Sequence, residues 1–262
     1  MIISHRYRYV FVELPRTGST AISDELRAHY DGARILAKHS TYRDFLRIAS
    51  DDEKRYFTFS CIRDPLDDVV SRYQKLVTDH NRRFSHPVKA RYAVGIKRAE
   101  QIAHGEPSDR TKPRRRSIVD LMENRRYRFV QRTKADFPTY FRRYYHLPYD
   151  NWSRLDHDHL DFMIRFEALQ QDFATVLAML GIEQVRPLPV VNRTIGKADC
   201  ASYYTPETIG RAKRVFGPFM ERWGYPLPAE WGSPSHPRVH RSLYEALGVP
   251  RTVYWRYLRG RV

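Results

Sequence analysis

Apolar residues gather in short β-prone runs along the chain, and each run is followed by a loop and a stretch with helical spacing. The first run covers residues 9–12 (Tyr-Val-Phe-Val) and ends before Pro15. Apolar positions four residues apart follow it, which indicates a helix that opens at Ser19 or Thr20. This first unit is therefore predicted as a buried strand, a tight loop and a helix.

The same order of elements recurs twice. Residues 56–62 form a second apolar strand, and Pro65 suits the first position of the helix that follows. Residues 162–166 form a third strand, with a helical face over residues 169–180 behind it, and a further helix is predicted for residues 205–224. Strand–loop–helix units in series predict an α/β fold with a central parallel sheet flanked by helices.

The chain of 262 residues is long enough for one large α/β domain, which we expect over residues 1–230. Residues 78–159 are rich in Arg and Lys and interrupt the strand–helix pattern, so they are predicted to be a helical insertion. The composition then shifts towards Pro, Ser, His and Arg. Residues 231–262 are therefore predicted to be a basic tail, or a helix packed on the domain.

Positive charge dominates the composition, because 46 Lys and Arg stand against 30 Asp and Glu, a formal net charge of +16. Such a balance favours an anionic partner, which includes a nucleic acid, an acidic membrane surface, a nucleotide or an acidic glycan. The chain shows no zinc-ligand spacing and no tandem recognition module. Nucleic acid is therefore not expected as a partner, and a basic nucleic-acid-binding protein is kept as an alternative.

Cysteine content and hydropathy bear on location. The two cysteines, Cys61 and Cys200, are too few for a disulfide framework, so both are expected to be reduced. No apolar run approaches the roughly 20 residues that span a bilayer, and the first residues lack the apolar core of a signal peptide. We therefore expect a cytoplasmic location and no transmembrane segment.

The loop between the first strand and the first helix contains a candidate anion site. Gly18 lets the backbone approach a phosphate, and the hydroxyls of Ser19 and Thr20 can donate to phosphate oxygens. These two residues also start a helix whose first N–H groups lack intrahelical partners. Arg16 adds a permanent positive charge. The loop lacks the Gly-Lys-Ser/Thr of a Walker A motif, which weakens the alternative of a P-loop-type nucleotide kinase or hydrolase. A loop whose hydroxyls only cap the helix is the structural alternative.

Three segments together resemble the sulfotransferases of the carbohydrate type (sulfotransferase family 2-like), which use 3′-phosphoadenosine-5′-phosphosulfate (PAPS). Residues 57–73 (FTFSCIRDPLDDVVSRY) are similar to the family pattern F-x-F-x-x-R-[ND]-P-x-D-x-x-x-S-x-Y, with one additional residue between the second Phe and the Arg. Residues 11–22 (FVELPRTGSTAI) are similar to its phosphosulfate loop, and residues 162–182 to its R-[FY]-E-[ND]-L segment. The resemblance covers residues 9–77 and 160–226.

The resemblance implies a P-loop-like three-layer core, PAPS as the sulfuryl donor, 3′-phosphoadenosine-5′-phosphate (PAP) as the product, and no metal. It carries over two groups of donor-binding residues. The phosphosulfate end would be held by Arg16, Thr17, Gly18, Ser19, Thr20 and Ala21. The 3′-phosphate would be bound by Arg63 and Ser71, and by Arg193 and Lys197 of a strap over the nucleotide. A solvated basic loop is the alternative for the strap.

Sulfuryl transfer needs in-line geometry, stabilisation of charge and a general base for the acceptor hydroxyl. The family usually has Lys at the position of Arg16, so Arg16 is interpreted as an electrostatic stabiliser that cannot give up a proton. His39, in a Lys-His-Ser-Thr segment similar to one in relatives, is the first candidate base, and Glu13 is the second. A surface His and an exposed strand-end carboxylate are their structural alternatives. Without a base, the chain would be a non-catalytic relative that binds the nucleotide.

The acceptor is expected to be a hydroxyl of a carbohydrate or other small molecule, with an anionic glycan among the options. The insertion is predicted to bind it, because arginines and aromatic residues interleave there. These residues, which suit sugar stacking or a hydrophobic core, are Tyr140, Arg142, Arg143, Tyr144, Tyr145 and Trp152. The tail residues 254–259 suit either peripheral contact with an anionic membrane or packing on the domain.

Overall fold

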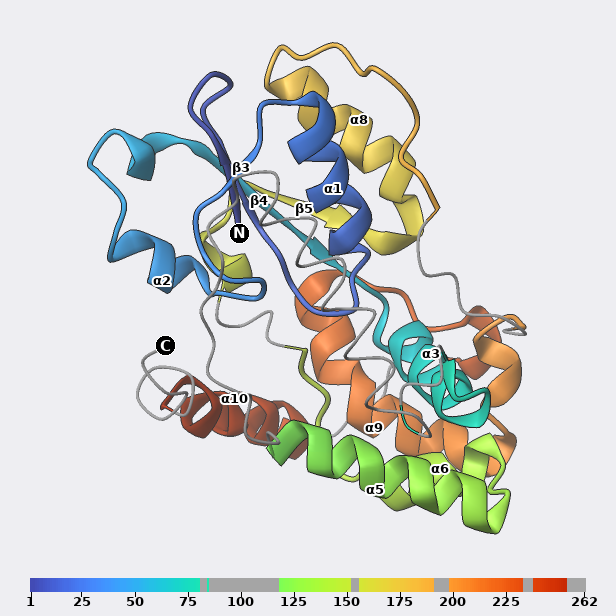
Figure 1. Ribbon diagram of the computed structural model, residues 1–262. Coiled ribbons are helices and arrows are strands. Elements are labelled where there is room, and N and C mark those ends of the chain that lie inside the picture. The colour runs from blue at the N-terminus through green and yellow to red at the C-terminus, as the bar shows by residue number, and fades with distance from the viewer. Residues whose placement is uncertain (81–83, 85–117, 152–155, 191–197, 233–237, 254–262) are drawn as a thin grey trace. The chain divides into compact units, whose positions relative to one another are not determined.

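The computed structural model (Figure 1) describes residues 1–80, 84, 118–151, 156–190, 198–232 and 238–253. The chain divides into two compact units. The first unit comprises Met1–Pro65, Leu147–Asn192 and Gly210–Val262, and the second comprises Leu66–His146 and Arg193–Ile209. The expectation of one domain with an insertion over residues 78–159 stays a prediction.

The first unit is built on a five-stranded sheet with the order β3-β1-β2-β4-β5. The strands are β1 (Ile2–Ser4), β2 (Tyr9–Val12), β3 (Ala33–Arg34), β4 (Phe57–Ile62) and β5 (Phe162–Arg165). Strands β2, β4 and β5 pair in parallel, which confirms the predicted parallel centre of an α/β fold. At one edge β1 pairs antiparallel with both β2 and β3, and this antiparallel edge was not predicted.

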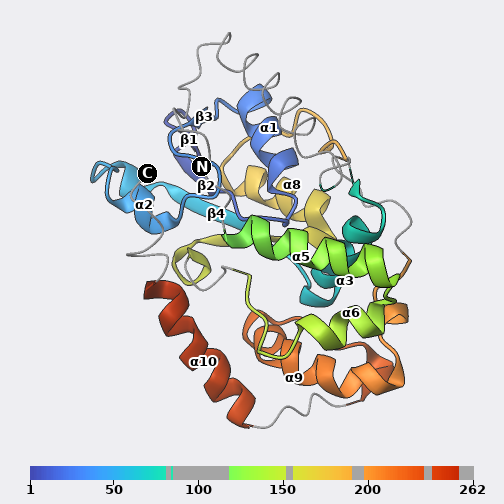
Figure 2. The same cartoon turned by 60° about the horizontal axis from the view of Figure 1, so that its bottom comes forward.

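Both faces of strand β2 are buried, as the continuous apolar run predicted. Tyr9 and Phe11 point to one face, where they pack with α1 (Ser19–His29) and α8 (Leu169–Met179). Val10 points to the other face and packs with Phe45 of the short helix α2 (Tyr42–Leu46). Figure 1 shows α1 and α8 together on one side of the sheet, and Figure 2 shows the same two helices side by side from a second direction. The sheet therefore has apolar layers on both sides, and its strand ends are fixed by packing.

The remaining helices follow the predicted order. Pro65 opens α3 (Pro65–Val77), and Pro206 opens α9 (Pro206–Trp223), so both predicted helix starts are confirmed. A helix, α10 (Arg238–Val253), forms within the segment predicted as a basic tail or helix. Short 3-10 helices cover Glu53–Arg55, His157–His159, Phe166–Ala168, Ala201–Tyr203 and Ala229–Trp231.

Aromatic side chains form the centre of the second unit, around α5 (Ile118–Thr133) and α6 (Phe137–Tyr144). Tyr140 is fully buried and lies 5.3 Å from the ring of Tyr73, and Tyr145 is 8% exposed. Of the two interpretations of these tyrosines, the hydrophobic core is therefore confirmed, and sugar stacking by Tyr140 and Tyr145 is wrong. Arg142 and Arg143 remain exposed on α6, and Trp152 lies outside the described residues.

Two adjacent ionisable residues of the first unit are buried against the sheet. Asp156 accepts a hydrogen bond from the N–H of Tyr42 at 2.5 Å, at the first turn of α2. Burial raises the pKa of Asp156 to about 7, against the opposing effect of the Tyr42 amide. Burial lowers the pKa of His157 to about 3, and its ring lies edge-on to Trp223 at 5.4 Å. The fold therefore keeps His157 neutral above about pH 3. It keeps Asp156 protonated below about pH 7.

Replacement of Asp156 by Asn should remove one specific pH dependence of stability. The folded pKa of Asp156, about 7, lies above its ordinary value of 3.8, so folding binds a proton in this window. Wild type should lose stability relative to Asp156→Asn as pH rises from about 4 to about 7, by up to roughly 1.4 kcal/mol per pH unit. Urea unfolding of both proteins across this range measures the difference. A difference that does not change with pH would contradict the buried, protonated carboxyl.

Candidate donor-binding site

The loop that joins β2 to α1 turns through two residues in the left-handed region. Arg16 has φ 66° and Gly18 has φ 80°, and Gly18 is the N-cap residue of α1. A Cβ at Gly18 would lie 3.0 Å from the ring of Phe166, so this position requires glycine for its conformation and for space. A left-handed Arg is uncommon, and such strain concentrates at functional sites.

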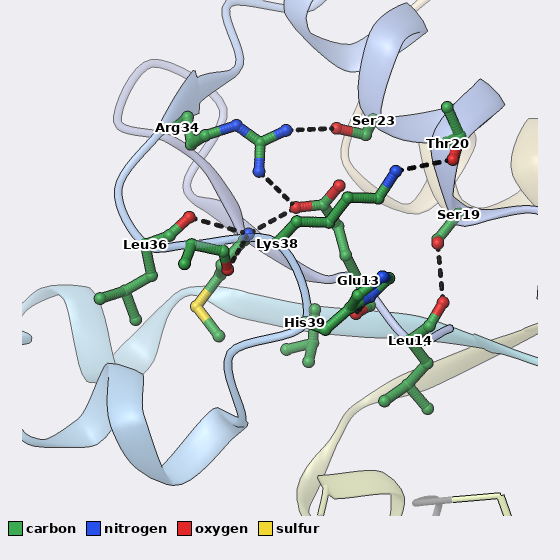
Figure 3. A network of polar contacts seen from close by, with 12 residues as sticks. Glu13, Leu14, Ser19, Thr20, Ser23, Arg34, Leu36, Lys38 and His39 are labelled. Atoms are coloured by element: carbon green, nitrogen blue, oxygen red, sulfur yellow. Dashed lines mark hydrogen bonds and ion pairs between the residues drawn. The ribbon is translucent and has the colours of Figure 1, made fainter. Parts of the chain in front are cut away.

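Two hydroxyl groups at this loop donate hydrogen bonds to a main-chain carbonyl of the loop itself. Thr17 Oγ1 donates to the carbonyl of Leu14 at 3.1 Å. Ser19 Oγ donates to the same carbonyl at 2.7 Å, as Figure 3 shows. Both residues are buried. A hydroxyl has one proton to donate, so the predicted donation from Ser19 Oγ to a phosphate is not available in this arrangement. The hydroxyls hold the loop in shape, which leaves the main-chain N–H groups at the start of α1 as the candidate anion-binding elements.

Lys38 brings an ammonium to the same helix start. Its Nζ donates to Thr20 Oγ1 at 2.8 Å, across 18 residues of sequence, and the side chain is exposed (Figure 3). Sequence reasoning noted the Lys-His-Ser-Thr segment for its histidine and missed the lysine. One signal in the sequence could have pointed to Lys38. The loop carries Arg16 at a position where the family usually has Lys, so an ammonium group could be expected from another segment.

Arg63 follows the last residue of β4 and is 7% exposed. Its Nη1 donates to the carbonyl of Arg16 at 3.1 Å, and its guanidinium lies over the Phe166 ring, 4.1 Å from the centroid. Phe166 thus contacts Arg63 on one side and approaches Gly18 on another. The structure therefore brings together three of the predicted elements, namely the β2 loop, the end of β4 and the end of β5, at the carboxyl edge of the parallel strands, where α/β folds bind ligands.

The structure says less about the other residues predicted to bind the donor. Ala21 is buried in the first turn of α1, and its N–H donates to the carbonyl of Gly18 at 3.1 Å. Ser71 is 2% exposed on α3 and belongs to the second unit. Arg193 and Lys197 lie outside the described residues. The predicted 3′-phosphate contacts of these last three residues stay predictions.

His39 lies next to the end of β2, where its own left-handed backbone and a hydrogen bond to a main-chain carbonyl position it. It has φ 69°, and its Nδ1 lies 2.9 Å from the carbonyl oxygen of Glu13 (Figure 3). A carbonyl only accepts, so Nδ1 must carry the proton, and in the neutral ring the lone pair is then on Nε2. This tautomer is the one that a general base requires when Nε2 faces the substrate.

Glu13 is fully buried, so the expectation of an exposed strand-end carboxylate is wrong. Its Oε2 pairs with the ammonium of Met1 at 2.6 Å and with Arg34 Nη1 at 2.8 Å. Burial alone would raise the pKa of Glu13, but the two cations outweigh it and hold the pKa at about 2. A carboxylate so stabilised is a poor proton acceptor, which removes Glu13 as the alternative base.

Arg165 and Glu167 flank Phe166 and have structural roles. The Arg165 guanidinium donates to the carbonyl of Trp223 at 3.0 Å and lies over the ring of Tyr225. Glu167 accepts from the N–H of Asp64 at 2.8 Å and from the hydroxyl of Tyr225 at 3.2 Å. These contacts fix the segment that presents Phe166 to Arg63.

Comparison of the sequence with known protein families shows which family the chain belongs to. A family model described as "Sulfotransferase family" matches residues 1–216. The chain belongs to the sulfotransferase family. No curated protein and no solved structure matches the chain. As a sulfotransferase, the protein is a transferase of sulfuryl groups, and its matched range includes all five strands and the whole loop from β2 to α1.

Substitution of Gly18 by Ala should reveal the close approach of Phe166. The change adds the strain of a left-handed alanine, on the order of 1 kcal/mol, and a contact of 3.0 Å with the ring. The matched control is Gly181→Ala, because Gly181 has φ 69° and nothing lies within 4 Å of its added Cβ. Thermal unfolding should show a larger loss for Gly18→Ala than for Gly181→Ala. Equal losses would contradict the packing of Phe166 on the loop.

Proposed function

We propose that this sulfotransferase uses PAPS as the sulfuryl donor and transfers the group to a hydroxyl of a carbohydrate or other small acceptor. The observation that carries the proposal is the start of α1, a P-loop-like junction of strand, left-handed loop and helix. Gly18 leaves the N-terminus of this eleven-residue helix without a side-chain cap, and Lys38 reaches the same turn. The helix dipole and the N–H groups of its first turn favour an anion there.

The phosphosulfate end is assigned to this helix start. Main-chain N–H groups at Ser19 and Thr20 and the positive charges of Arg16 and Lys38 suit the 5′-phosphate and the sulfuryl oxygens. The remaining loop residues shape the turn, since Thr17 and Ser19 brace it through the Leu14 carbonyl. The assignment keeps the predicted set from Arg16 to Ala21, and it moves the contact of Ser19 from its hydroxyl to its N–H.

Arg63 is assigned to the nucleotide's 3′-phosphate. It stands at the carboxyl end of β4, one strand from the phosphosulfate loop, and it is tied to that loop through the Arg16 carbonyl. A guanidinium suits planar recognition of a phosphate. Phe166, stacked on Arg63, holds the guanidinium plane in one orientation.

Transfer proceeds by in-line attack. His39 Nε2 takes the proton of the acceptor hydroxyl, and the hydroxyl oxygen forms a bond to sulfur while the bond from sulfur to the phosphate oxygen of PAPS breaks. The products are the sulfated acceptor and PAP. Arg16 stabilises charge on the departing phosphate, and Lys38 supplies the same stabilisation with a proton that it can share. Carbohydrate acceptors are favoured here by the family resemblance and by the net charge, which suits anionic sugars.

Binding of PAP tests the assignment of the 3′-phosphate site. Calorimetric titration should show micromolar affinity for PAP and weaker affinity for adenosine 5′-monophosphate, which lacks only the 3′-phosphate. Arg63→Ala should weaken PAP by about tenfold or more, as expected for a lost charge-assisted bond. It should weaken the monophosphate less, because that ligand loses only the support that Arg63 gives to the loop through the Arg16 carbonyl.

The matched control is Arg55→Ala, because Arg55 is an exposed surface residue paired with Asp52. It should bind PAP as wild type does. Absence of PAP binding by the folded wild type would contradict PAPS as donor. An equal loss for both nucleotides in Arg63→Ala would contradict the 3′-phosphate assignment alone.

Substitution of His39 by Asn tests the general base. Asn tolerates a left-handed backbone, and its amide can still donate to the Glu13 carbonyl, but it has no basic nitrogen. PAP release from PAPS with a panel of carbohydrate acceptors should fall by about a hundredfold or more, while PAP affinity changes little. His5→Asn, at an exposed position, is the control. Unchanged turnover in His39→Asn would remove His39 as the base.

A further inference from the structure

Helix α10 (Arg238–Val253) carries an apolar stripe on its exposed side. Val239 is 67% exposed, Leu243 39%, Val249 64% and Val253 44%. With the exposed Ala246 and Pro250, these residues occupy an arc of about 120° on a helix that advances 100° per residue, and Ser242 is the one polar residue within it. An arc of this width normally faces a protein core.

The opposite side of α10 is the side that packs on α9 within the first unit. Tyr244 is 1% exposed and Gly248 is buried on that side. Arg241 pairs with Glu221 at 3.2 Å, and Glu245 pairs with Arg222 at 3.4 Å. The helix therefore turns its ion-paired side towards α9 and its apolar side away, which is the reverse of an ordinary surface helix.

Positive charge accompanies the stripe. From Arg238 to the end of the sequence at residue 262, the chain has six arginines and one acidic residue, Glu245. The same stretch continues after α10 with Tyr254, Trp255 and Tyr257 interleaved with arginines in the sequence. Aromatic residues and arginines are the side chains that favour the interface between lipid headgroups and acyl chains.

We propose that the apolar stripe of α10 is a peripheral docking surface for an anionic lipid bilayer, with the helix lying in the plane of the interface. Charge complementarity selects this occupant. A second copy of the chain docked on the same stripe would bring two strongly basic segments together, whereas anionic headgroups attract each basic residue by about 1 kcal/mol. Within the described residues, no helix combines the length and apolar character needed to cross a membrane.

Vesicle co-sedimentation of the full chain tests the proposal. The chain should bind vesicles that contain phosphatidylserine, bind vesicles of phosphatidylcholine alone weakly, and release from the anionic vesicles as salt increases. The double variant Val239→Asp, Val249→Asp should lower the partition into anionic vesicles by about tenfold or more. Met179→Asp is the matched control, because Met179 is a 57% exposed apolar residue on another helix, α8. It should bind as wild type does.

Three outcomes would overturn the proposal. These are no binding of wild type to anionic vesicles at low salt, equal binding of wild type and the double variant, and a dimer in light scattering that the double variant abolishes. The last outcome would assign the stripe to a second copy of the chain. Circular dichroism reports whether the double variant folds, and the single variant Val249→Asn replaces it in the same assay if it does not. The proposal does not depend on PAPS, since vesicle binding is measured without nucleotide.

Discussion

The carboxylate of Glu13 lies fully buried at the end of β2, where it pairs with the Met1 ammonium and with Arg34 of β3. A buried charge is tolerable only while its partners stay in place, and loss of one partner costs on the order of 3–5 kcal/mol. The same residue's main-chain carbonyl accepts from His39. One residue therefore ties the antiparallel edge of the sheet to the candidate base, and the position of the Lys38–His39 segment depends on it.

The carboxyl edge of the parallel strands is held by contacts of a different kind. Phe166 stands between Gly18 and Arg63, and Arg63 reaches the Arg16 carbonyl, so the loop after β2 is joined to the segments after β4 and β5. Each of these contacts is short and specific, and each links residues that are distant in sequence. The sheet beneath them is covered on both faces, and a sheet fixed in this way would preorganise the proposed anion site.

Sequence patterns predicted the parts that depend on local spacing. The three parallel strands and the helix starts at Ser19, Pro65 and Pro206 follow from periodicity and turn chemistry. The predicted approach of Gly18 to a phosphate stays a prediction. Strands of two and three residues, such as β3 and β1, are too short to produce a period. The positions of the Glu13 and Lys38 side chains depend on partners 12 to 21 residues away in the sequence. The direction of the Ser19 hydroxyl depends on the shape of the loop. A local sequence pattern therefore could not predict these three features.

We propose that the start of α1 receives the phosphosulfate end of the donor. A crystal structure of the protein with PAP tests it most directly. We expect the 5′-phosphate to lie within hydrogen-bond distance of main-chain N–H groups of the loop and the first turn of α1, with the Lys38 ammonium in contact. A complex in which the phosphate binds elsewhere, with the α1 start unoccupied, would contradict it.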